Sequence, residues 1–393
     1  MPKQIPVTIV SGFLGAGKTT LINKVLKEEH KEHIAVIINE FGSVGVDHQF
    51  VLDVKEDIYQ MDNGCLCCTL RNDIPSTLES ILSAKEKMGV KVDRILFETT
   101  GLADPAPIAH TFINVPFLNE NFIVDAVLTV VDAKNFLKET KEQEEPAKQV
   151  GFADKIFISK HQLVDSQTYH DVIESVRSIN AFAPIQDLSE KEVTLKDMFN
   201  LELFYASEEK VLEMEERAKE DECPHCHEHH EHGEHCCHHE HGECCHHDED
   251  CDCDCHDHEH CHHDEHDCDC DCDHHDEHGH CKHHGEHKHH HRHPHHSGIT
   301  SFVFEAEKPL NLSKINQWLN ELVYYYGEQL YRYKGILNVE GIEHQIIFQG
   351  VQMSFDISKG RDWGPTERKS TLVFIGKNLP EEQLRKGFDE CTK

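Results

Sequence analysis

Three cysteines lie within four residues at Cys65, Cys67 and Cys68, in the stretch GCLCC that begins at Gly64. Thiolates at this density are typical of a metal site, and sulfur-to-metal distances of about 2.3 Å suit Zn²⁺, which takes tetrahedral donors. The identity of a fourth donor stays open among Glu40, a histidine, water and a ligand from another protein. An incomplete protein ligand set suits metal exchange, whereas buried free cysteines are the structural alternative.

A phosphate-binding loop precedes the cysteines. The segment GFLGAGKTT follows the apolar run Pro6 to Val10 and leads into a helical pattern through Leu26. This order of strand, loop and helix predicts a Walker A loop, whose backbone N–H groups hold a di- or triphosphate. We expect Lys18 to neutralise the β and γ phosphates and Thr19 to bind Mg²⁺. The residues predicted to bind nucleotide here are Gly12, Gly15, Ala16, Gly17, Lys18, Thr19 and Thr20.

Two further predicted strands end in residues that suit the same site. Val92 to Phe97 ends at Glu98, which predicts a Walker B acid that organises magnesium, and Gly101 follows with a backbone N–H for the γ phosphate. Lys155 to Ile158 ends at Ser159 and Lys160, predicted nucleotide contacts. The carboxyl ends of parallel strands meet at one edge of a sheet, where ligands bind.

A third apolar strand, Ile34 to Ile38, leads to Glu40 and later to Asp47. Acids at the ligand-binding edge of the sheet would serve a switch segment, magnesium or a second metal. We therefore include Glu40, and Asp47 with weaker support, among the candidate metal ligands. A solvated loop is the alternative interpretation.

Strand and helix patterns alternate through the first half of the chain, which predicts an α/β fold with a doubly wound, mostly parallel sheet of the P-loop NTPase type. We assign residues 1–206 to this domain and residues 207–222 to a charged helix or linker that leads out of it. Residues 223–297 form a His/Cys/Asp-rich insert, and residues 298–393 form a small α+β domain.

The insert carries most of the unusual composition. Of the 18 cysteines in the chain, 14 lie between Cys223 and Cys281, interleaved with histidines. Residues 223–297 hold 21 Asp and Glu against 3 Lys and Arg, or −18 of the formal net charge of −35. Almost nothing there could pack a core, so we expect disorder without metal and binding of several divalent ions.

Composition also limits the location and the partners. So many closely spaced cysteines would pair at random in an oxidising compartment, so a reducing cytoplasm is expected. The remaining acidity disfavours a nucleic-acid partner. No apolar run predicts a signal peptide or a membrane span, so no membrane partner is expected. A homo-oligomer stays open.

The C-terminal region predicts a second folded domain. Expected strands are Thr300 to Glu305, Leu330 to Val339, His344 to Phe348, Val351 to Phe355 and Leu372 to Ile375. Expected helices are Leu312 to Tyr325 and Pro380 to Cys391. No catalytic group of residues is visible in it, so docking or regulation is the expected role.

The phosphate loop, the NEFG segment that contains Glu40, GCLCC and ETTG occur in an order that resembles the CobW family of P-loop GTPases, over nearly the whole chain. The resemblance implies GTP binding, slow hydrolysis, a divalent metal at Cys65, Cys67 and Cys68, and delivery of that metal to client proteins. It also implies a CobW-type C-terminal domain. Zinc is the expected metal, with Co²⁺ and Ni²⁺ as alternatives.

One position departs from the family pattern. Relatives recognise guanine through Lys-x-Asp, and the matching residues here are Lys160, His161 and Gln162. An Asp carboxylate accepts from two guanine N–H groups, whereas a glutamine amide offers one acceptor oxygen and a donor. The loss of one hydrogen bond costs about 1 to 3 kcal/mol, so a weaker preference for GTP is expected.

The sequence therefore predicts a cytoplasmic GTPase, with Lys18 and Glu98 as catalytic residues, that delivers a divalent metal to client metalloproteins under nucleotide control. A metal store based on the insert is the alternative from another functional class. Cobalt handling in cobalamin synthesis is a further alternative, and a P-loop kinase or synthase lacks a visible acceptor site.

Overall fold

The computed structural model describes residues 4–28, 32–39, 58–61, 70–189, 193–220, 298–364 and 368–392 of the 393-residue chain. Among them, no helix is long and apolar enough to cross a membrane. The predicted disorder and metal binding of the insert fall outside these residues.

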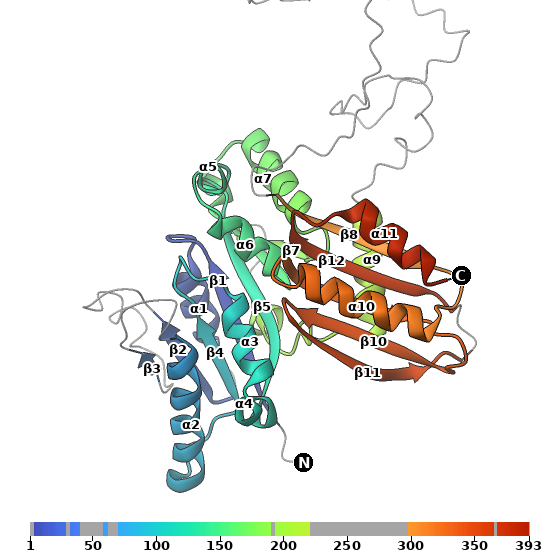
Figure 1. Cartoon of the computed structure of the whole chain (residues 1–393). Coiled ribbons are helices and arrows are strands. Elements are labelled where there is room, and N and C mark those ends of the chain that lie inside the picture. The colour runs from blue at the N-terminus through green and yellow to red at the C-terminus, as the bar shows by residue number, and fades with distance from the viewer. Residues whose placement is uncertain are drawn as a thin grey trace, which may run out of the picture. The chain divides into compact units, whose positions relative to one another are not determined.

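A parallel sheet organises the first half of the chain, and seven strands of it lie in the described residues (Figure 1). Their order is β3-β2-β4-β1-β5-β6-β7, with β1 in the centre and every pairing parallel. The strands are short runs rich in Val and Ile, typical of a sheet buried on both faces. They are β1 (Ile5–Gly12), β2 (Ile34–Asn39), β3 (Ile58–Met61), β4 (Arg94–Glu98), β5 (Phe122–Asp132), β6 (Lys155–Ser159) and β7 (Ile185–Asp187).

Helices cover both faces of this sheet, which confirms the doubly wound α/β fold. On one face, Val7, Ile9 and Phe97 share a core with Leu78 of α2 and Val176 of α7. The opposite face packs on α1 and α8 through another buried cluster. The helices of this part of the chain are α1 (Lys18–Leu26), α2 (Leu70–Met88), α3 (Ala106–Asn114), α4 (Pro116–Asn121), α5 (Phe136–Glu142), α6 (Glu145–Phe152), α7 (Ser166–Ile179) and α8 (Leu195–Met198). A further helix, α9 (Glu208–Glu220), follows them and does not belong to these layers.

The C-terminal region forms an antiparallel sheet in the order β11-β10-β9-β12-β8. Its aromatic core joins Phe304 and Phe374 of the sheet to Trp318 and Phe388 of its two helices. The α+β prediction for this region is confirmed. The elements are β8 (Ile299–Ala306), α10 (Leu312–Tyr326), β9 (Leu330–Leu337), β10 (His344–Val351), β11 (Ser354–Asp362), β12 (Ser370–Lys377) and α11 (Glu381–Glu390).

The antiparallel sheet also packs on the first domain. Tyr331, Val373 and Ile375 belong to the same buried cluster as Val150 and Phe152 of α6. Gly151 leaves room for this contact, because a Cβ atom added there would lie 3.0 Å from the Tyr331 ring. Helix α6 therefore contacts both the parallel sheet and the C-terminal sheet.

One predicted strand was wrong. Val351 to Phe355 spans the turn of a hairpin and is not one strand. Val351 ends β10 and pairs with Ser354, which begins β11, and Gln352 in the turn has a φ of 50°. The alternation of Val351, Met353 and Phe355 imitates a strand, and the turn lacks the Asn-Gly or Gly-Gly pair that marks most two-residue hairpins.

The charged helix predicted at 207–222 is present as α9, but it does not lead out of the folded part. Val211 is fully buried against Ile336 and Trp363. Glu215 of the same helix is 2.7 Å from Lys369 and accepts a hydrogen bond from Thr371. The helix is therefore packed on the C-terminal sheet.

Candidate nucleotide site

The phosphate loop joins the end of β1 to the start of α1. Gly12 has a φ of 139°, and a Cβ atom there would lie 2.4 Å from the Val130 carbonyl oxygen, so only glycine fits. Gly17 caps α1 with a φ of 103°, and Gly15 has a φ of 72°. These left-handed conformations favour glycine and turn the backbone N–H groups towards a ligand at the helix N-terminus.

The side chain of Lys18 is held in place by main-chain carbonyl groups of the loop. Lys18 is 8% exposed, and its Nζ donates to the carbonyl oxygens of Gly12 at 2.8 Å and Phe13 at 3.2 Å. Because both acceptors are neutral, an anionic phosphate would compete well for this ammonium group. Thr20 is exposed.

Thr19 contacts the predicted Walker B acid. Its Oγ1, in the first turn of α1, donates to Oε1 of Glu98 at 2.7 Å. Glu98 ends β4, where it pairs with Val10 of the adjacent β1. Glu98 is 4% exposed. A hydroxyl and a carboxylate are hard oxygen donors of the kind that Mg²⁺ prefers, so the pair fits magnesium.

Gly101 follows Glu98 and lies against the phosphate loop. A Cβ atom at Gly101 would approach the Leu14 backbone nitrogen to 2.6 Å, so the contact requires glycine. The same loop contains Asp104, which accepts from the Ala106 backbone and whose pKa is raised by burial.

Gln149 was missed in the sequence analysis. It is fully buried on α6, and its Nε2 donates to the carbonyl oxygens of Gly101 and Ala103, at 3.0 Å each. It lies 48 residues from Gly101 in the sequence, and no local motif marks it. Gln149 therefore connects the loop after Glu98 to the helix that contacts the C-terminal sheet.

Ser159 ends β6 and contacts the phosphate loop, and Lys160 follows it. The Ser159 hydroxyl donates to the Ala16 carbonyl at 2.7 Å. Lys160 has a φ of 61°, and its Nζ lies 2.6 Å from Oδ2 of Asp132, at the end of β5. The predicted strand ends thus meet at one edge of the sheet.

The residues after Lys160 make contacts of their own. Gln162 accepts a hydrogen bond from the Ser189 hydroxyl through Oε1, at 2.7 Å. The His161 ring stacks on Tyr169 with 3.7 Å between centroids, and its Nδ1 is 2.8 Å from Oδ2 of Asp187. Asp187 and Ser189 were not among the predicted site residues; Asp187 ends the short β7 and Ser189 follows it.

The predicted metal ligands Cys65, Cys67, Cys68, Glu40 and Asp47 lie outside the described residues. Of the residues that the structure describes, no group of three or more His, Cys, Asp or Glu could hold a metal ion. The ends of the strands that precede these residues are described. Ile38 of β2 pairs with Glu98, and Asn39 pairs with Met61 of β3, so both strands end at the edge where the phosphate loop lies.

Two family models match the chain. Residues 6–187 match the CobW/HypB/UreG nucleotide-binding domain, and residues 299–392 match the cobalamin synthesis protein cobW C-terminal domain. The zinc chaperone YjiA of Escherichia coli is 30% identical over 390 residues, which cover 99% of each chain. The chain belongs to the CobW family.

Other relatives of this CobW-family chain align with about half of it. A zinc-regulated GTPase metalloprotein activator 1 from Schizosaccharomyces pombe is 35% identical over 188 residues, covering 46% of this chain and 45% of that protein. The zinc chaperone CobW of a Sinorhizobium species is 33% identical over 204 residues, half of each chain. The crystal structure of Zn(II)-bound YjiA GTPase from E. coli matches with a TM-score of 0.69 and 26% identity over the whole of both chains. The fold of this CobW-family chain is thus that of a P-loop GTPase.

Proposed function

We propose that the protein is a GTP-hydrolysing metallochaperone that binds a divalent metal, zinc first, at Cys65, Cys67 and Cys68 and transfers it to client metalloproteins. The main support is the pairing of Ile38 with Glu98 and of Asn39 with Met61. Because β2 and β3 end in register with Glu98, the segments that carry Glu40 and the cysteines leave the sheet at the edge where Thr19 contacts Glu98. The relatives named as zinc chaperones favour zinc over Co²⁺ and Ni²⁺.

The described residues account for the nucleotide chemistry. Lys18 would exchange its two carbonyl acceptors for phosphate oxygens, and the Gly101 N–H would lie beside the γ phosphate. Thr19 would hold Mg²⁺ directly and Glu98 would hold it directly or through its waters; when bound, the ion neutralises charge on the β and γ phosphates. Lys160 would lie along the base.

Nucleotide control requires that GTP and metal binding are coupled. The Glu40 and Asp47 segment follows β2, which pairs with β4, so a ligand that orders this segment can change the geometry of the cysteines. Such coupling is reciprocal: metal must change GTP affinity by the factor by which GTP changes metal affinity.

The test is to measure the dissociation constant of GTP, in the presence of Mg²⁺, with and without one equivalent of Zn²⁺. The matched control carries Cys65, Cys67 and Cys68 all changed to Ser, with the insert intact. We expect Zn²⁺ to change GTP affinity in the wild type and not in the control. Equal constants in the wild type would remove the proposed control, and an equal response in both proteins would place it at other metal ligands.

The composition of the insert favours a second role within the same protein, storage of metal. Residues 223–297 lie between the two matched family domains and contain 14 cysteines. Deletion of the insert separates the roles. If the metal response of GTP hydrolysis survives deletion, the insert is a reservoir; if the whole response is lost, storage is the main function.

A further inference from the structure

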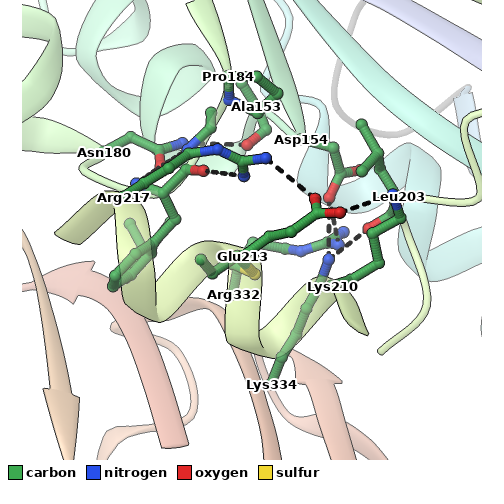
Figure 2. Close-up of a pocket in the computed structure, with 14 residues that line it drawn as sticks. Ala153, Asp154, Asn180, Pro184, Leu203, Lys210, Glu213, Arg217, Arg332 and Lys334 are labelled. Atoms are coloured by element: carbon green, nitrogen blue, oxygen red, sulfur yellow. Dashed lines mark hydrogen bonds and ion pairs between the residues drawn. The ribbon is translucent and has the colours of Figure 1, made fainter. Parts of the chain in front are cut away.

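A pocket lies between α9, strand β9 and the segments 153–154 and 180–184 (Figure 2). Its enclosed volume is about 20 Å³, and the wider space of about 410 Å³ includes open solvent. Helix α9 contributes Lys210, Glu213 and Arg217, and β9 contributes Arg332 and Lys334. The pocket is separate from the phosphate loop, none of whose residues lines it.

Positive charge exceeds negative charge among these residues. Glu213 pairs with Arg217 at 3.0 Å and with Lys210 at 3.6 Å. A second carboxylate, Asp154, is shared by Arg332 at 2.7 Å and Lys334 at 3.2 Å. Four cations therefore face two carboxylates in a chain whose formal net charge is −35.

Arg332 also has an unused donor. Its side chain is 95% buried, and its Nη2 donates to Asp154 and to the Phe204 carbonyl oxygen. Its Nη1 is buried and has no hydrogen-bond partner among the residues that the structure describes. A buried donor on a charged group is costly to leave unpaired, so the site is incomplete as it stands.

Burial and the neighbouring charges both act on Lys334. Burial, above all, lowers the pKa of Lys334 to about 8; Asp154 opposes this effect, and Arg332 and Lys210 add to it. Asp154 offers one negative charge to two buried cations, which both contact its Oδ1, while its Oδ2 accepts from the Val127 backbone at 2.9 Å. An anion in the pocket would accept a hydrogen bond from the unpaired donor of Arg332 and would offset the excess positive charge.

We propose that this pocket binds a small inorganic oxyanion, with Arg332 Nη1 and Lys334 as its buried donors and Lys210 and Arg217 at its rim. Guanidinium and ammonium groups form charge-assisted hydrogen bonds to such oxygens. Arg332 and Lys334 belong to the C-terminal sheet, whereas Asp154 belongs to the nucleotide-binding domain. The bound anion would therefore strengthen the contact between these two folded regions.

The test is calorimetric titration of inorganic phosphate into the full, metal-free chain at constant ionic strength. All proteins carry Lys18→Ala, which weakens oxyanion binding at the phosphate loop. We expect one saturable site that is lost in Arg332→Met and weakened several-fold in Lys210→Gln. The matched control is Lys138→Gln, which removes an equal charge from an exposed i,i+4 pair with Glu142 and should leave phosphate affinity unchanged.

Circular dichroism establishes whether Arg332→Met is folded. If it is not, Lys210→Gln and Arg217→Gln decide, because both side chains are about one quarter exposed and their loss should not unfold the chain. The proposal is overturned if phosphate shows no saturable binding, or if the two rim variants bind it as the Lys138→Gln control does.

Discussion

The buried amide of Gln149 donates a hydrogen bond to the main-chain carbonyl of Gly101 at 3.0 Å. A second bond of the same length reaches Ala103. The loop that carries Gly101 lies directly against Leu14 of the phosphate loop. Gln149 is therefore a positioning residue, because it holds the main chain beside the proposed phosphate site without itself being part of that site.

We expect Gln149→Glu to lower kcat for GTP hydrolysis. The largest decrease expected is the one that corresponds to an activation free energy raised by about 1 to 3 kcal/mol. An ionised carboxylate cannot donate and would repel both carbonyl oxygens. Burial raises the pKa of such a carboxyl, and its protonated form can restore one bond. The ratio of variant to wild-type kcat should therefore rise as the pH falls.

Gln143→Glu is the matched control for this substitution, because Gln143 is exposed at the end of α5. It should follow the wild-type pH profile. A Gln149→Glu variant with wild-type kcat at every pH would show that the contact with Gly101 does not position the loop.

The hydrogen bond between Thr19 and Glu98 leads to a prediction about magnesium. Glu98→Gln keeps an acceptor for the Thr19 hydroxyl but removes the negative charge, so Mg²⁺ affinity should fall by about 10-fold to 100-fold. Thr19→Ser keeps the hydroxyl, so its Mg²⁺ affinity should fall much less. The measurement is the Mg²⁺ concentration that gives half-maximal GTP hydrolysis, and an unchanged value in Glu98→Gln would exclude the assigned role.

The phosphate loop, Glu98, Ser159 and Lys160 could be picked out from the sequence, because each depends on a short motif or on the end of one apolar strand. Their roles in nucleotide binding stay predictions. Gln149 could not be found in this way, since its partners are main-chain atoms of a loop 48 residues away. Arg332 and Lys334 alternate with Tyr331 and Tyr333 as in a strand with one polar face, yet all four are buried. Their burial depends on domain packing, which no local pattern records.

Base recognition can be tested at Gln162. Its Oε1 already accepts from Ser189, so Nε2, which can only donate, is the part of the amide left for a base. Gln162→Asp supplies a carboxylate for guanine N1–H and N2–H, and the preference for GDP over IDP should rise by about 1 to 3 kcal/mol. Competition against a fluorescent GDP analogue measures it.

Ser189→Ala is the companion variant, because it frees the Gln162 oxygen without adding a charge. We expect it to raise the preference for GDP less than Gln162→Asp does. An unchanged ratio of GDP to IDP affinity in Gln162→Asp would mean that this position does not face the base.

The pKa of Lys334 predicts how stability depends on pH. In the folded chain, burial lowers this pKa from 10.5 to about 8. Asp154 raises it in part, and Arg332 and Lys210 lower it further. Between these two values the unfolded chain binds more protons, so the contribution of Lys334 to the free energy of unfolding rises with pH in this window. In Lys334→Met this contribution is absent.

The quantity to measure is therefore the free energy of unfolding of the wild type minus that of Lys334→Met, from urea titrations at several pH values. Burial also raises the pKa values of Tyr331 and Tyr333, and raises that of Cys391 to about 11; these groups lower stability at high pH but are present in both proteins. The difference should increase from about pH 8 upwards. A difference that stays flat would mean that Lys334 keeps an ordinary pKa, and that its charge is already compensated in the pocket.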